Sequence, residues 1–181
     1  MDLVRLARIH AHLCGDGMIC TYKSSEPDHR NRADIVYFNS NPQLINEFRE
    51  DMRALFGVQM TWIPKRIRVG VKSLRIARYL LTLSQYHSRR WSIPPLFLDA
   101  SRRVKIAWTT AFANDEGYVP RDRSWIRIKS VNHTGLMQVR SMLDSLQIDS
   151  RITGPNCDRT WYLNISKEKE FQHFNKVHCR K

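Results

Sequence analysis

Two short segments, far apart in the chain, decide the fold. The first reads Ile9-His10-Ala11-His12-Leu13-Cys14-Gly15-Asp16-Gly17, and the second reads Thr109-Thr110-Ala111-Phe112-Ala113-Asn114-Asp115-Glu116-Gly117. Each runs through apolar and small residues into an acidic residue, Asp16 or Glu116, which glycine follows. Glycine suits a helix end because it tolerates backbone conformations that other residues avoid. The two segments therefore predict two helices that each end in a carboxylate.

Both predicted helices carry alanine five positions before the acid, at Ala11 and Ala111. Small side chains let two helices pack closely, because the distance between their axes depends on the side chains at the contact. If these helices lie side by side, Asp16 and Glu116 meet at one end and form a candidate site for a hard divalent cation. The alternative is that both acids only cap or orient helix ends, although an acid at a helix C-terminus opposes the helix dipole.

The rest of the chain repeats one order of elements. In the first half we expect a helix at 3–14, strands at 18–23 and 33–38, a helix from Asn41-Pro42, a hairpin of 58–63 and 65–71, and a helix at 72–83. In the second half we expect strands at 118–119 and 125–131, a helix, a hairpin of 148–153 and 159–165, and a helix from Lys167. The middle helices share one apolar spacing, seen in Ile45, Phe48, Met52 and Leu55 and in Leu136, Val139, Leu143 and Leu146.

This repetition predicts an α+β protein made of two pseudo-symmetric repeats, each ordered helix, two strands, helix, two strands, helix. The first repeat spans residues 1–83, a linker spans 84–100, and the second repeat spans 101–181. The shared order of elements thus predicts a duplicated fold from the residues alone.

Composition favours a nucleic-acid partner. The 181 residues include 30 Lys and Arg against 17 Asp and Glu, which gives a formal net charge of +13. Such an excess suits a polyanion, although a merely solvated basic surface is the alternative. The four cysteines form no CxxC pair and indicate thiols; Cys157, His173, His178 and Cys179 do not have the spacing of a common zinc site. Since no hydrophobic run approaches membrane-spanning length, we expect a soluble, cytoplasmic protein.

The paired segments resemble the two motifs of the LAGLIDADG homing-endonuclease family in its single-chain, two-repeat form. The stretch before the second motif, Ile93-Pro94-Pro95-Leu96-Phe97 followed by the basic lead-in 101–108, adds to the resemblance. The first motif is degenerate, because His10 and His12 stand where apolar residues are usual. The resemblance implies motif helices packed at the centre and antiparallel sheets that form a DNA-binding saddle.

The resemblance also implies an activity, which is site-specific cleavage of double-stranded DNA by a monomer with Mg²⁺, for which Mn²⁺ or Ca²⁺ can substitute. It assigns Asp16 and Glu116 as metal ligands and catalytic residues, with help from the backbone carbonyls of Gly15 and Asp115. The family keeps a lysine or glutamine near the start of each middle helix. In the first half that position falls at Asn39 or Ser40, and in the second half Lys129 is the nearest catalytic candidate. The alternative is a relative that does not cleave, either a DNA-binding regulator or a splicing maturase that binds structured intron RNA.

Strand alternation indicates which side chains meet a ligand. We expect Arg66 and Arg68 on one face, with Ile67 and Val69 on the other. A two-stranded ribbon fits the DNA major groove, where Arg and Asn can contact base edges. The alternative is an ordinary antiparallel sheet with one polar face. The candidate DNA-binding residues are Tyr22, Lys23, Arg66, Arg68, Arg127, Lys129, Tyr162 and Asn164. We interpret His10 and His12 as core or interface residues rather than as bases.

Overall fold

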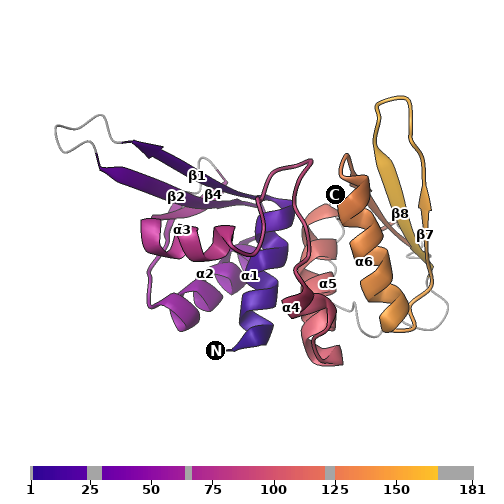
Figure 1. The fold of residues 1–181 in the computed structure, drawn as a ribbon, viewed down its shortest axis with the longest axis horizontal. Coiled ribbons are helices and arrows are strands. Elements are labelled where there is room, and N and C mark those ends of the chain that lie inside the picture. Colours follow the sequence, from indigo (N-terminus) through magenta and orange to yellow (C-terminus); the bar gives the residue numbers. More distant parts are fainter. Residues whose placement is uncertain (1, 24–29, 64–66, 121–124, 167–181) are drawn as a thin grey trace.

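The computed structural model describes residues 2–23, 30–63, 67–120 and 125–166 and contains two halves with the same order of elements (Figure 1). The first half consists of α1 (Leu3–Gly15), β1 (Gly17–Lys23), β2 (Asn31–Phe38), α2 (Pro42–Phe56), β3 (Thr61–Ile63), β4 (Arg68–Lys72) and α3 (Leu74–Leu81). After α4 (Pro95–Leu98), the second half consists of α5 (Arg102–Glu116), β5 (Gly117–Tyr118), β6 (Trp125–Ser130), α6 (His133–Ser145), β7 (Ser150–Thr153) and β8 (Trp161–Ser166). The predicted α+β class is confirmed. The helix predicted from Lys167 lies outside the described residues.

Local capping residues explain where the middle helices begin. At the start of α2, the Asn41 side chain accepts a hydrogen bond from the backbone N–H of Gln43, and proline occupies the first turn. Asn132 has the same function at the start of α6, where it accepts from the N–H of Gly135. The two middle helices therefore begin with the same capping residue.

Each half folds its strands into one antiparallel sheet of the same topology. The strand order is β1-β2-β4-β3 in the first sheet and β5-β6-β8-β7 in the second, and the sheets flank the central pair α1 and α5 (Figure 1). One face of each sheet carries buried side chains, including Ile35 and Tyr37 on β2 and Ile126 and Ile128 on β6. Alternation places the other residues of these strands on the opposite face, called here the open face.

The structure corrects the predicted hairpin in the first half. Ile67 was expected beneath the sheet with Val69, but it has a φ of 50° and is 50% exposed, and β4 begins only at Arg68. A β-branched residue in this conformation belongs to a turn, because a positive φ takes the chain out of the extended strand geometry. Val69 is fully buried, as predicted. Arg66 lies outside the described residues.

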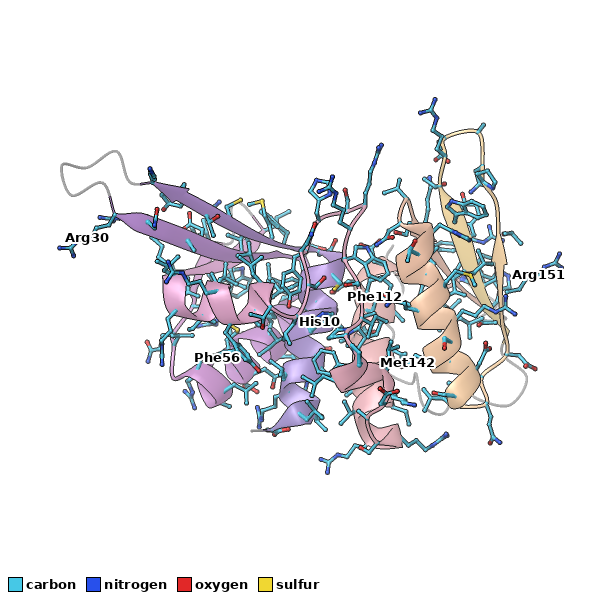
Figure 2. All side chains as sticks on the ribbon, viewed as in Figure 1. His10, Arg30, Phe56, Phe112, Met142 and Arg151 are labelled. Atoms are coloured by element: carbon cyan, nitrogen blue, oxygen red, sulfur yellow. The ribbon has the colours of Figure 1, made fainter. Side chains whose placement is uncertain are left out.

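The two motif helices pack against each other at the centre of the molecule. The indole N–H of Trp108 on α5 donates to Nδ1 of His10 on α1 over 2.9 Å, and Trp108 stacks on Phe112 with ring centroids 5.0 Å apart. Figure 2 shows His10 and Phe112 between the two halves. Ala11 and Ala111 are buried, in agreement with a closely packed pair of helices. The two halves therefore share one core.

Residues 84–100 pack into this core. Trp91 is buried against Phe112, with ring centroids 5.0 Å apart. The Gln138 side chain on α6 accepts from the backbone N–H of Ile93 and donates to the Ile93 carbonyl, at 2.8 and 3.2 Å. The segment is thus fixed to the second half, while the division into repeats at 1–83 and 101–181 stays a prediction. Within the described ranges, no helix is long and apolar enough to cross a membrane.

Candidate active site and nucleic-acid interface

The C-terminal ends of α1 and α5 meet at Gly15 and Asp115. A Cβ atom added at Gly15 would lie 2.9 Å from the Cβ atom of Asp115, so the absence of a side chain at Gly15 makes room for the aspartate. Asp16 caps α1 and Glu116 is the last residue of α5, and both are half-buried. The structure therefore brings Gly15, Asp16, Asp115 and Glu116 to the same end of the helix pair (Figure 1).

Asn39 connects two of these acidic side chains. Its Nδ2 donates to Oδ2 of Asp16 and to Oδ1 of Asp115, each over 3.2 Å. Its Oδ1 accepts from the backbone N–H of Asn41 over 2.9 Å, which fixes the orientation of the amide. Asn39 is one of the two positions at which the sequence lacks the expected lysine. The structure places there an amide that holds the Asp16 carboxylate in position.

Asp115 is completely buried, and its carboxylate has partners on both oxygens. The Tyr37 hydroxyl donates to Oδ1 over 2.6 Å, and Nδ1 of His12 donates to Oδ2 over 2.8 Å. Burial and the nearby Asp115 charge raise the pKa of Tyr37 well above its usual value, so this hydroxyl stays a donor. These hydrogen bonds supply what a buried carboxylate requires in place of water.

His12 completes a buried ion pair across the helix interface. Its full burial lowers the pKa, but Asp115 and Glu47 outweigh that effect and raise the pKa from 6.5 to about 9. Its second nitrogen, Nε2, lies 3.4 Å from Oε1 of Glu47. At neutral pH the imidazole is therefore a cation between two carboxylates.

His10, two residues earlier on α1, is neutral. Burial lowers its pKa from 6.5 to about 3, although a hydrogen bond with the Ser92 backbone opposes the shift. Both histidines are fully buried, which confirms that they are core and interface residues. The charge on His12 and the side-chain role of Asp115 were not predicted from the sequence. The sequence did contain a feature that indicates this role, because the second motif has Asp115 where the first motif has Gly15.

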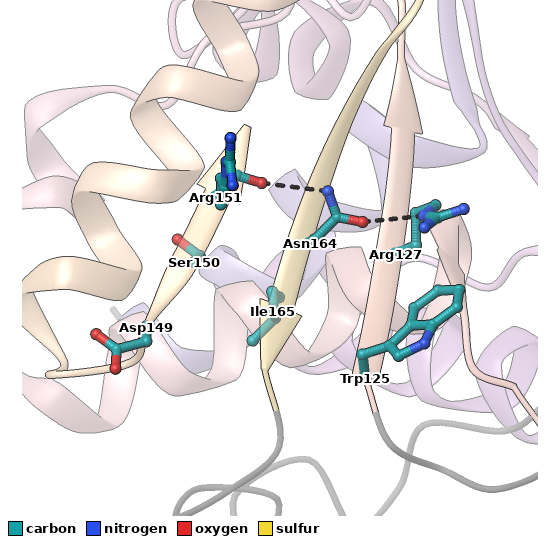
Figure 3. A pocket seen from close by; sticks show the side chains of 7 residues that line it. All are labelled: Trp125, Arg127, Asp149, Ser150, Arg151, Asn164 and Ile165. Carbon is teal, nitrogen blue, oxygen red and sulfur yellow. Dashed lines mark hydrogen bonds between the residues drawn. The ribbon is translucent and has the colours of Figure 1, made fainter. Parts of the chain in front are cut away.

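On the open face of the second sheet, the Arg127 side chain contacts an amide and two aromatic rings. Its Nε donates to Oδ1 of Asn164 over 2.9 Å, and its guanidinium lies 4.4 Å from the ring centroid of Trp125 and 4.9 Å from that of Tyr162. A hollow of about 520 Å³ adjoins it (Figure 3), lined by Trp125, Arg127, Asp149, Ser150, Arg151, Asn164 and Ile165. The candidate DNA-binding residues Arg127, Tyr162 and Asn164 thus form one cluster.

Lys129 lies on the same open face, but its ammonium group has an acidic partner. Its Nζ donates to Oδ2 of Asp158 over 2.6 Å, and this hydrogen bond raises the pKa of Lys129 and, with one from Thr160, lowers that of Asp158 to about 2. Strand pairing joins Gly117 to Ile128, so Glu116 lies beside the strand that carries Lys129. The structure thus places Lys129 near the second acid with its ammonium directed to Asp158.

The open face of the first sheet carries basic, acidic and apolar side chains. The Tyr22 hydroxyl donates to Oδ1 of Asp34 over 3.4 Å, and Arg68 pairs with Phe38 in the ladder. Lys23 is exposed at the end of β1, but it pairs with Asn31 and therefore belongs to the opposite face, which carries Ala33 and Ile35. A hollow of about 350 Å³ on this side includes Asp34, Val36, Arg68 and Lys72 in its lining. This sheet therefore combines basic side chains with an acid and apolar residues.

The donor set at the helix ends suits a hard cation. In the part of the chain that the structure describes, no cluster of three or more His, Cys, Asp and Glu side chains is arranged to hold a metal ion. Both oxygens of Asp115 already accept hydrogen bonds. The residues that could hold Mg²⁺ are therefore Asp16 and Glu116, with backbone carbonyls and water, which is a typical oxygen environment for this ion.

Comparison with known proteins agrees with this architecture. Residues 114–179 match the family described as LAGLIDADG-like domain. The fold is similar to that of mesophilic variants of the homing endonuclease I-DmoI, with a TM-score of 0.71 and 19% identity over 92% of this chain and 85% of that chain. It is similar to I-DmoI in complex with DNA and Mn, with a TM-score of 0.70 and 19% identity over 91% of this chain and 90% of that chain.

A different protein shares the fold as well. The N-terminal LAGLIDADG domain of DUF199/WhiA has a TM-score of 0.62 and 12% identity over 99% of this chain and 83% of that chain. Among curated proteins, none matches the sequence. The resemblance seen in the two motifs is confirmed, because residues 114–179 match the LAGLIDADG-like domain and the chain has the LAGLIDADG fold.

Proposed function

We propose that this protein is a site-specific, metal-dependent DNA endonuclease that acts as a monomer inside the cell. The observation that supports the proposal is the meeting of the two helix ends at Gly15 and Asp115, because Asp16 and Glu116 follow these residues directly in the chain. The net charge of +13 supports a polyanionic partner. I-DmoI, which has the same fold, was solved in complexes with DNA and Mn and with DNA and Ca.

Asp16 and Glu116 hold a divalent cation in this proposal, and the backbone carbonyls of Gly15 and Asp115 assist. Mg²⁺ is the expected ion, and Mn²⁺ or Ca²⁺ can take its place. When bound, such an ion activates water and neutralises charge on the scissile phosphate. Asn39 orients the Asp16 carboxylate through its hydrogen bond. Lys129 can turn from Asp158 to a phosphate at little energetic cost, because their ion pair is exposed.

The open faces of both sheets contact the duplex in this proposal. Arginine and asparagine can read base edges, and lysine contacts phosphate. The assigned DNA-binding residues are Tyr22, Lys23, Arg66, Arg68, Arg127, Lys129, Tyr162 and Asn164.

A second candidate function is nucleic-acid binding without cleavage, as a DNA-binding regulator or as a maturase on structured intron RNA. The observation that favours it is the composition of the centre, where an asparagine stands in place of a lysine and Lys129 is paired with Asp158. The same open faces serve either function, so the carboxylates and the lysine distinguish the two.

One selection experiment tests both candidates. The protein is incubated with a random duplex library in Mg²⁺ or Mn²⁺, and the bound and the cut fractions are sequenced. We expect Asp16→Asn and Glu116→Gln to abolish cutting while binding persists, because each change removes a charge that the cation needs and preserves size. Asp144→Asn on α6 is the control, since Asp144 is exposed and forms an ion pair with Arg140 at 3.9 Å.

The possible outcomes separate the two functions. Unchanged cutting by both carboxylate variants would remove these acids from the mechanism. A parent protein that selects a duplex site but does not cut it in either metal ion would support the second candidate. If structured RNA displaces the selected duplex, the maturase form of that candidate gains support.

A further inference from the structure

Arg127 has the geometry of a preorganised recognition residue. It lies on β6, which has a strand on each side in the order β5-β6-β8-β7, and its side chain belongs to the open face. The guanidinium contacts the Trp125 and Tyr162 rings at 4.4 and 4.9 Å. Cation–π contacts with two rings restrict the plane of the guanidinium before any ligand arrives.

Asn164 fixes the guanidinium further. Its Oδ1 accepts from Nε of Arg127 over 2.9 Å, and its Nδ2 lies 3.4 Å from the carbonyl of Arg151 (Figure 3). The same Nδ2 lies 3.3 Å from Oγ1 of Thr153. The amide can accept from Arg127 only in this orientation, and the two contacts from β7 maintain it. A chain of hydrogen bonds across three strands therefore directs one arginine.

The outer edge of the same guanidinium is available to a ligand. Nε is occupied by Asn164, and no acceptor among the described residues makes a hydrogen bond with Nη1 or Nη2. Lys129 differs, because its ammonium already binds Asp158. A planar pair of N–H donors with a fixed direction matches the O6 and N7 acceptors of guanine in the major groove.

We infer that Arg127 reads a guanine in the DNA site, with Asn164 as its positioning residue. The inference rests on the proposed function, because it requires a duplex against the open face. A base edge is favoured over a phosphate, because the major groove admits a two-stranded ribbon and a bidentate arginine contact with guanine is the commonest specific contact there. A correct bidentate contact of this kind gives roughly 5- to 150-fold discrimination against another base.

The test is a binding selection without divalent cations, in which the parent and Arg127→Lys are compared on the same random duplex library. Lysine retains the charge but loses the planar pair of donors. We expect the parent to select a guanine at one position and Arg127→Lys to lose that preference alone, with the other positions and the salt dependence unchanged. Asn164→Ala should weaken the same preference partially.

Arg151→Lys is the matched control, because Arg151 is exposed on β7, which β8 separates from the strand of Arg127, and its substitution should leave the guanine preference intact. Thermal melting of each variant establishes that the fold is intact. If the parent selects a site and Arg127→Lys retains every base preference, the inference is overturned while the proposed function stands. If the parent binds no duplex, both are overturned. Equal weakening on all sequences by Arg127→Gln would indicate a phosphate contact and would also overturn the inference.

Discussion

Strands β2 and β6 occupy the same place in two sheets of identical topology, but their open faces differ. Gly17 pairs with Tyr37 in the first sheet as Gly117 pairs with Ile128 in the second. From this register, the open-face residues Asp34, Val36 and Phe38 of β2 correspond to Trp125, Arg127 and Lys129 of β6. The buried faces of both strands remain apolar. Packing constrains only the buried face, so the chemistry of the open face is free to differ between the halves.

The helix ends show a second difference between the halves. Asp115, the residue before the last in α5, stands in the second motif where the first motif has Gly15. Its hydrogen-bond partners His12, Tyr37 and Asn39 all come from the first half. The halves are therefore joined by a buried polar network that has no symmetric counterpart. The pseudo-symmetry of the backbone does not extend to the charges at the centre.

The largest expected effect on stability comes from removing the charge of Asp115, the residue that distinguishes the second helix end from the first. We expect Asp115→Asn to lower the free energy of unfolding by about 3–5 kcal/mol, because it leaves the buried His12 cation without its main partner. Urea denaturation followed by circular dichroism measures the change. Asp144→Asn, which affects an exposed pair with Arg140, should change stability by about 0–1 kcal/mol. If Asp115→Asn loses no more unfolding free energy than Asp144→Asn, the result would contradict a charged pair of His12 and Asp115.

Deprotonation of His12 should lower the free energy of unfolding as the pH rises above neutral. Its pKa is raised from 6.5 to about 9 in the folded state, so its contribution is complete below pH 6.5 and is lost as pH rises through 9. The loss amounts to roughly 3 kcal/mol. Urea denaturation between pH 6.5 and 9.5 measures this loss. In His12→Gln the free energy of unfolding should vary less with pH over the same range. The same slope in parent and variant would assign the alkaline loss to other groups.

His10 should give the opposite dependence, on the acid side. Because its pKa is lowered from 6.5 to about 3, its contribution is present above pH 6.5 and falls as pH decreases toward 3. Between pH 6.5 and 5 we expect a loss of roughly 2 kcal/mol. His10→Gln should reduce this acid sensitivity in the same denaturation measurements, with His12→Gln as the comparison. If His10→Gln loses as much unfolding free energy between pH 6.5 and 5 as the parent does, His10 is not held neutral in the folded protein.

The smallest effect concerns Asp34 on the open face of the first sheet. We expect Asp34→Asn to raise affinity for duplex DNA by roughly 2- to 5-fold at low salt, because it removes a repulsive charge from that face. Fluorescence anisotropy in two salt concentrations measures the gain, which should shrink at the higher one. Asp144→Asn serves again as the control and should leave affinity unchanged. Equal gains from both variants would indicate a general charge effect and not contact by this face.

The sequence predicted much of the backbone. The acid-ended helices, the cap of the first middle helix at Asn41 and the alternation of side chains along the strands all depend on residues within a few positions of each other. The matching cap of the second middle helix, Asn132, was not predicted. Hydrophobic periodicity and capping are local, so they can be read without knowledge of the fold. The failure at Ile67 occurred where a turn interrupts the strand, a feature that alternation alone does not reveal.

The candidate site was predicted only in part. The pairing of the two motifs predicted that Asp16 and Glu116 reach one end of the helix pair, and the meeting of Gly15 with Asp115 agrees with that. Their roles in catalysis and metal binding stay a prediction. The hydrogen bonds of Asn39 to two carboxylates were not predictable, because they depend on how β2 lies beside both helix ends.

The sequence by itself determined the duplicated order of elements, the acids at both helix ends and the basic character of the protein. Only the tertiary structure decided that His12 is a cation and His10 is neutral, although both are buried on the same helix. It also decided that Asn164 directs Arg127 while Asp158 holds Lys129. The physical reason is that helix and strand patterns arise from neighbours in the chain, whereas the pKa and orientation of a side chain depend on partners that only folding brings near.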